Sequence, residues 1–156
     1  MQAVIDAIVA ALENADFAAV KSILTAAPAQ SVQIAVGVKS ARQNGAYEYL
    51  GQRQVDGQLL PYYGKNLALT VFFRVYAPRT LGCAACLENA DALAAFLTQG
   101  ISGVKLDKLT VGEARFDGQS DCFVCELTAD CDGRIYATAN EDETEFTDFI
   151  LKGEAK

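Results

Sequence analysis

Histidine and tryptophan are absent from this sequence of 156 residues, while methionine occurs once and proline three times. Without histidine, the chain cannot form a Ser-His or Cys-His nucleophile pair, a histidine general base or a mixed Cys/His zinc site. No apolar run approaches the roughly 18 to 20 residues of a membrane span, and the first residues lack the positively charged region of a signal peptide. We therefore expect a protein of the cytoplasm with reduced thiols and no membrane contact.

The length and composition predict one domain over residues 1–156, with 51% hydrophobic and 21% charged residues. The net charge of −7 is unevenly placed. Residues 1–80 hold seven Lys/Arg against five Asp/Glu, whereas residues 81–156 hold six against fifteen. An acidic half would repel a phosphate backbone, so we expect no nucleic-acid partner. The asymmetry is compatible with complementary protein surfaces, and equally with an acidic face kept for solubility.

Cysteine is the one residue type that offers chemistry. Five are present, and Cys83, Cys86, Cys122 and Cys125 form two C-x-x-C pairs, the spacing of a zinc ribbon. Residues 121–131 alternate in polarity like a strand, so an offset of three places Cys122 and Cys125 on opposite faces, where they cannot share an ion. We expect structural thiols, with no metal and no cofactor. A disulfide or thioredoxin-like redox pair is the next alternative, and zinc the last.

The first forty residues predict two helices and a strand. Apolar residues recur at helical spacing from Val4 to Leu12, and Asp16 is a candidate N-cap for a second helix that continues to Leu24 and ends before Pro28. Residues 1–27 are thus expected to be a helical N-terminal segment. Residues 31–39 then alternate strictly, as a half-buried strand does.

A tyrosine-rich stretch follows, over residues 40–66. It predicts an irregular projecting hairpin at 46–66, with Asp56-Gly57 as its turn. Few aliphatic residues occur in it, and its tyrosines are interleaved with Gly, Gln and Arg. Such a hairpin is typical of an arm that touches a partner, although an ordinary surface hairpin remains the alternative.

The remaining chain predicts a helix and several strands. A strand over 67–77 stops at Pro78, and a helix over 81–99 is capped by Gly100. Strands are then expected at 105–116, 121–131, 134–138 and 146–153, with Asp-Gly turns at 117–118 and 132–133. The acidic residues 141–145 are expected to be a solvated loop, since no calcium-loop spacing is present. The fold class is therefore α+β, a single mostly antiparallel sheet with helices packed on one face.

Four segments together resemble the tail-terminator or tail-completion proteins of phages and prophages. They are the strand at 67–77 running into 76–79 (YAPR), the alanine-rich helix to Leu97, residues 111–117 (VGEARFD) and the terminal residues 145–153. The resemblance implies a small non-enzymatic α+β protein that caps the tail tube as a homo-oligomeric ring and contacts tube and neck proteins. It also implies assembly in the bacterial cytoplasm and residence in the virion or a phage-tail-like particle.

Under this resemblance the contact regions are the hairpin and the acidic loop. The residues expected at the interface are Arg53, Tyr62, Tyr63, Lys65, Glu141, Asp142, Glu143 and Glu145. Two other classes stay open. One is a small cytoplasmic binding module with a pocket against the sheet. The other is a redox protein that uses Cys83.

Overall fold

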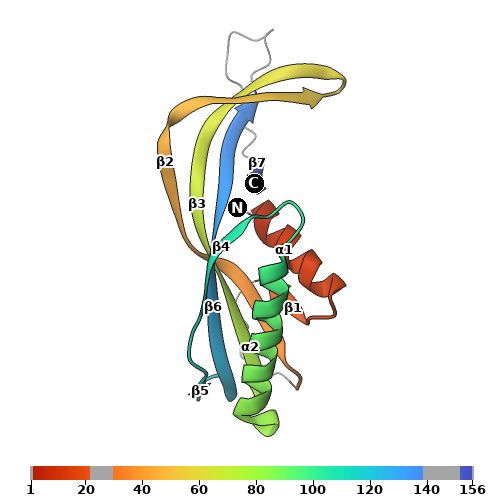
Figure 1. Cartoon of the computed structure of the whole chain (residues 1–156), viewed down its shortest axis with the longest axis vertical. Helices are drawn as coiled ribbons and strands as arrows, with labels where there is room; N and C mark the ends of the chain where they lie inside the picture. The colour runs from red at the N-terminus through yellow and green to blue at the C-terminus, as the bar shows by residue number, and fades with distance from the viewer. Residues whose placement is uncertain (1, 22–29, 139–151, 156) are drawn as a thin grey trace.

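The computed structural model describes residues 2–21, 30–138 and 152–155, and in these it has one seven-stranded sheet with two α-helices on one face (Figure 1). In chain order the elements are α1 (Gln2–Asn14), β1 (Ala19–Lys21), β2 (Gln33–Val55), β3 (Gln58–Pro78), a 3-10 turn (Arg79–Leu81), α2 (Gly82–Gln99), β4 (Leu106–Val111), β5 (Arg115–Asp117), β6 (Cys122–Thr138) and β7 (Lys152–Ala155).

Three long antiparallel strands form the frame of the sheet. Its order is β1-β2-β3-β6-β4, and β5 and β7 also pair with β6. Only β1 is parallel to its neighbour, β2. The predicted α+β class, with a mostly antiparallel sheet and helices on one face, is confirmed.

The core lies between the sheet and the helices, where the predicted apolar faces meet. Alternate residues of β3 and β6 point into it because side chains of a strand alternate between faces. Of the residues expected on the apolar faces of these two strands, Phe123 of β6 is partly buried and the others are buried; they are Leu67, Leu69, Val71, Phe73 and Val75 of β3, and Cys125, Leu127, Ala129 and Cys131 of β6. From α1 come Val4, Ile5, Ile8, Val9 and Leu12, and from α2 Cys86, Ala90, Leu93 and Leu97. Gly100 follows α2 at a φ of 85°, as a C-terminal cap requires.

The second N-terminal helix was predicted wrongly. Asp16 has a φ of 63°, outside the conformation of an N-cap, and Ala19–Lys21 is strand β1. The backbone N–H of Ile34 donates to the carbonyl of Ala18 at 2.8 Å, and β1 continues this pairing along β2. The edge of β2 thus offers backbone hydrogen-bond partners to residues 19–21. The spacing of apolar residues in this segment predicts a helix and gives no sign of that distant partner. Residues 22–29 lie outside the described residues.

The Asp132-Gly133 turn was also predicted wrongly, because β6 runs through it without a break. Asp132 pairs with Ala68 and Gly133 with Leu67, so β3 supplies partners on both sides of the expected turn. The strand expected at 105–116 is instead two strands, β4 and β5, separated where Gly112 donates its N–H to the Glu126 carbonyl. The turn after Asp117 is confirmed, and the Asp117 carboxylate accepts hydrogen bonds from Ser120.

The stretch expected to be irregular is a continuous hairpin. β2 and β3 pair from Gln33 to the predicted turn at Asp56-Gly57, where both residues have positive φ, 50° and 84°. Three bulges interrupt the ladder, each with the extra residues on β2. The hairpin extends beyond the helices and bends toward their side of the sheet (Figure 1). Of the last predicted strand, 146–153, only residues 152 and 153 are described, and they begin β7 (Lys152–Ala155).

Candidate interaction surface

The arm, defined here as residues 39–66 of β2 and β3, is the part of the structure with the least core. Among its described side chains Gly64 is the only buried residue. It is held by backbone pairing between β2 and β3, and β6 adds a third strand as far as Tyr62 and Thr138. A two-stranded ribbon without a buried face is marginally stable in water. Beyond Tyr62, the outer half of the arm is therefore held by backbone pairing between β2 and β3 and by the contacts of its own side chains.

Three tyrosines gather on one face of the arm. The Tyr63 ring lies 6.3 Å from that of Tyr47, in a stacked arrangement, and 5.5 Å from that of Tyr49, edge-on. They remain exposed, at 57% for Tyr47, 54% for Tyr49 and 38% for Tyr63. Leu59, near the turn, is 65% exposed. We call Tyr47, Tyr49 and Tyr63 the tyrosine cluster. Large rigid rings exposed together are the usual composition of a protein-binding surface.

The structure separates the predicted hairpin residues between two faces. Tyr63 and Lys65 alternate in register with Leu67 and so lie on the helix side of the sheet, where the Lys65 amino group donates to Gln43 at 3.3 Å. Tyr62 lies on the other face, close to Gly51, and Arg53 pairs opposite Leu60. Residues 141–145, with the predicted Glu141, Asp142, Glu143 and Glu145, lie outside the described residues.

Tyr47 and Tyr49 belong to the site but were not among the expected contacts. Their side chains share the face of Tyr63 only because the bulge between Val38 and Ser40 shifts β2 by one residue against β3, which turns the following residues of β2 to the other face. The signal in the sequence was the tyrosine-rich composition of the stretch. The pairing itself depends on a bulge that no local pattern indicates.

The opposite face of the sheet has a polar region in which ion pairs form across the strands. The Glu126 carboxylate accepts hydrogen bonds from Lys39 and from Arg74, each at 2.7 Å. The bond from Lys39 is the main reason why the pKa of Glu126 lies below its usual value, and Arg74 adds to it. The Glu126 carboxylate in turn raises the pKa of Arg74. The sequence placed Glu126 in solvent and missed both partners, because β2 and β3 come beside β6 only in the fold.

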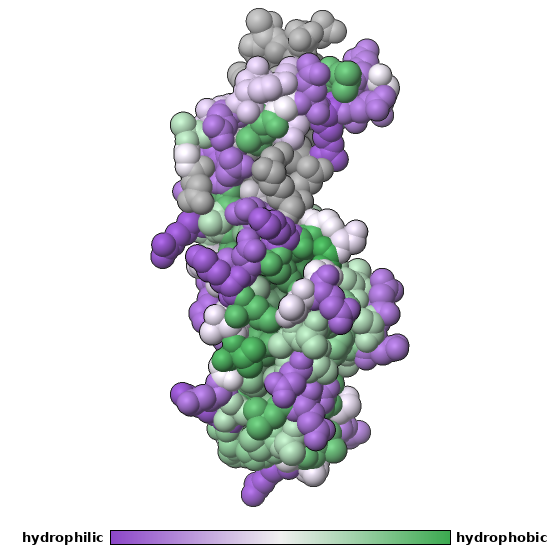
Figure 2. Space-filling model, viewed as in Figure 1, coloured by the Kyte–Doolittle hydropathy of each residue, from purple (hydrophilic) through white to green (hydrophobic). Residues whose placement is uncertain are grey.

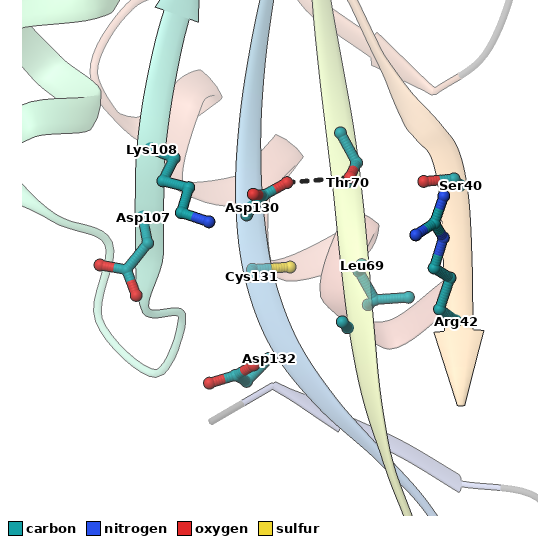
Figure 3. A pocket seen from close by; sticks show the side chains of 10 residues that line it. Ser40, Arg42, Leu69, Thr70, Asp107, Lys108, Asp130, Cys131 and Asp132 are labelled. Atoms are coloured by element: carbon teal, nitrogen blue, oxygen red, sulfur yellow. Dashed lines mark hydrogen bonds between the residues drawn. The ribbon is translucent and has the colours of Figure 1, made fainter. Parts of the chain in front are cut away.

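A cavity of about 440 Å³ lies on this polar face (Figure 3). Ser40 and Arg42 of β2, Thr70 of β3 and Asp130 of β6 are among its lining residues, with Asp107 and Lys108 at the β4 edge. The Thr70 hydroxyl donates to Asp130 at 2.9 Å, so part of this polar lining is already paired. Sites for small ligands are mostly apolar with a few converging polar groups. Most of the residues that line this cavity are polar or charged, so its composition suits water better than a small apolar ligand.

Four of the five cysteines are buried, and Cys83 is partly exposed. Cys122 and Cys125 lie on opposite faces of the sheet, as predicted; Cys125 belongs to the main core and Cys122 to a small second cluster with Ala35 and Tyr76. All five thiols are free. Burial raises the pKa of Cys86 and of Cys131 to about 11, which keeps both protonated at neutral pH. Among the described residues, no group of three or more Asp, Glu or Cys is placed to hold a metal ion.

One helical segment of the described chain, Arg79–Gln99, has the length and apolar composition of a membrane span. Only 22% of its most apolar 18-residue stretch is buried. A helix that packs one side on a sheet satisfies the same criterion. Here α2 contacts β3, β4 and β6 through its buried residues. Its other side is open to solvent, and the surface over α2 is largely apolar in Figure 2, whereas the arm is mostly hydrophilic with apolar patches.

No family model matches this chain, and no curated protein matches it at a significant level.

Proposed function

We propose that this protein is a structural tail protein of a phage or prophage, of the tail-terminator or tail-completion class, and that it acts through protein contacts without catalysis. The observation that supports this best is the arm, a long hairpin with exposed tyrosines that projects from a separately packed core. The sequence resemblance suggests that the assembly is a phage tail. The arm is a surface suited to protein contacts in such an assembly.

The arm has the composition of an interface. Tyrosine provides a large contact area with few rotatable bonds, so little conformational entropy is lost on binding. The tyrosine cluster already holds its rings in contact with one another. A surface whose side chains are ordered before binding retains more of the free energy of contact for affinity. A terminator needs this advantage, because it must bind the end of the tube more favourably than the next tube subunit does.

A deletion of the gene in its lysogenic host tests the function. We expect tails of uncontrolled length or tails that fail to join heads, measured by electron microscopy of induced lysates. In the complemented strain, Tyr63→Ser should reproduce the defect. Phe116→Ser should not, because Phe116 is an exposed aromatic residue of β5 at the end of the sheet opposite the arm. Normal infectious particles from the deletion strain would refute the proposal and leave the small binding module as the better one.

A further inference from the structure

The solvent side of α2 is an apolar and acidic surface without a partner among the described residues. Its exposed residues before Thr98 and Gln99 at the end of the helix are Ala84, Leu87, Glu88, Asp91, Ala92 and Ala95, which we call the α2 face. Leu87 is 45% exposed. No Lys or Arg occurs between Arg79 and Lys105, so nothing on the helix offsets its two carboxylates. Small side chains along such a face allow another element to approach closely, and a helix apolar enough to resemble a membrane span is unusual on a bare surface.

The arm is complementary to this face in both chemistry and charge. Residues 39–66 hold four Lys/Arg and two Asp/Glu, and one of the four, Lys39, is already paired with Glu126 on the other face of the sheet. On the side of the tyrosine cluster, the three rings offer flat apolar area, their hydroxyls can donate to carboxylates, and Lys65 adds a positive charge. The tyrosine rings would bury apolar area by packing on the alanines of the α2 face. The phenol hydroxyls and the Lys65 ammonium group would at the same time donate hydrogen bonds to Glu88 and Asp91.

The two surfaces cannot meet within one molecule. In the described residues α2 contacts β3, β4 and β6 on the core side, and the arm projects from the far end of the sheet (Figure 1). We propose that the arm of one molecule docks on the α2 face of a second copy of this chain. The inference rests on the proposed function, in that it assumes a protein that assembles. Because the two patches differ, the contact is head-to-tail and can propagate from subunit to subunit until a ring closes.

A lipid bilayer is the other occupant that an apolar helix face suggests, and charge argues against it. Anionic membrane surfaces attract Lys and Arg and repel carboxylates. The α2 face has Glu88 and Asp91 and no cation. The tyrosine-rich arm can cover the same apolar area, and its Lys65 is attracted by the carboxylates that an anionic membrane would repel.

Photo-crosslinking locates the contact directly. Benzoylphenylalanine replaces Tyr47 in a purified full-length chain, which is mixed with an isotopically heavy wild-type chain at concentrations up to about 1 mM, so that even a weak contact is populated. Residues 80–105 form one tryptic peptide because no Lys or Arg lies between Arg79 and Lys105. We expect the light arm to crosslink to the heavy 80–105 peptide. Absence of that product, or crosslinks mainly to another surface, overturns the proposal.

Complementation supplies the second test. Tyr63→Ser disables the arm and Leu87→Lys disables the α2 face, so each variant alone should lose self-association by at least about 10-fold in sedimentation measurements. A mixture of the two keeps one intact arm and one intact face, and should form a one-to-one heterodimer. Glu13→Lys, at an exposed position of α1, is the matched control and should associate as the wild type does. A mixture that stays monomeric contradicts the inference, as does retention of association by Leu87→Lys. Binding of the protein to vesicles of anionic lipid, lost in Leu87→Ser, would contradict it in favour of a membrane.

The outcomes separate the two proposals. A tail defect in the deletion strain without the arm-to-α2 crosslink leaves the function standing and removes the contact. The crosslink with normal particles in the deletion strain does the reverse.

Discussion

Removal of the tyrosine cluster should cost the fold little. Tyr63 makes both ring contacts of the cluster, so Tyr63→Ser breaks them together. Exposed cross-strand pairs contribute about 0.2 to 1 kcal/mol each, which gives a loss of about 1 kcal/mol and at most about 2. Leu127, with no exposed surface in the core, is the reference. Leu127→Ala should cost about 2 to 5 kcal/mol, since the packed neighbours cannot fill the cavity.

Urea denaturation at low protein concentration measures the difference without a contribution from self-association. With a dependence of about 2 kcal/mol per molar urea, Tyr63→Ser should lower the midpoint by about 0.5 M and Leu127→Ala by about 1.5 M. Equal shifts would refute the reasoning. They would show that the cluster belongs to the stabilising core, and that its exposure gives no ground for a role in binding.

Three further predictions concern the sheet itself. Leu127→Asp should prevent folding, whereas Thr128→Lys, one residue along on the other face, should change the free energy of unfolding by no more than about 1 kcal/mol; circular dichroism and thermal melts compare them. Glu126→Gln should cost about 1 kcal/mol at pH 7. Because the folded pKa of Glu126 lies below its ordinary 4.5, this stabilisation is complete above that value and is lost as the pH falls through the folded pKa, so the two stability curves should converge in acid below pH 4.5. Gly112→Ala should destabilise by about 1 to 3 kcal/mol, because a Cβ there would lie 2.8 Å from the backbone oxygen of residue 126, and Gly118→Ala, with nothing within 4 Å, should be nearly neutral.

The hydrophobic pattern predicted most of the core before the structure was known. Alternation along β3 and β6 and helical spacing in α1 and α2 each identified the buried face correctly. These patterns are reliable because burial selects apolar residues at the period of the local backbone, whatever the element packs against. The turn at Asp56-Gly57 could also be predicted from local sequence, because the turn needs two residues that tolerate positive φ and Asp-Gly provides them.

The errors fell where pairing between distant strands decided the outcome. Ala19–Lys21 is a strand because the edge of β2 was available to it, and Gly133 continues a strand because β3 extends far enough to pair with it. In both places long-range backbone hydrogen bonds outweighed the local preference, although Asp-Gly at 132–133 is a strong hairpin signal. The candidate site shows the same limit, because Tyr47 and Tyr49 face Tyr63 only through a bulge.

The sequence by itself determined most of the buried faces, that histidine chemistry is impossible, and that Cys122 and Cys125 face opposite ways. Each of these follows from composition or from the period of a single segment. Only the tertiary structure decided that residues 39–66 form a regular arm, that its tyrosines share one face, and that Glu126 lies between Lys39 and Arg74. These depend on the register between strands far apart in the chain, and register is fixed by the packing of the whole sheet.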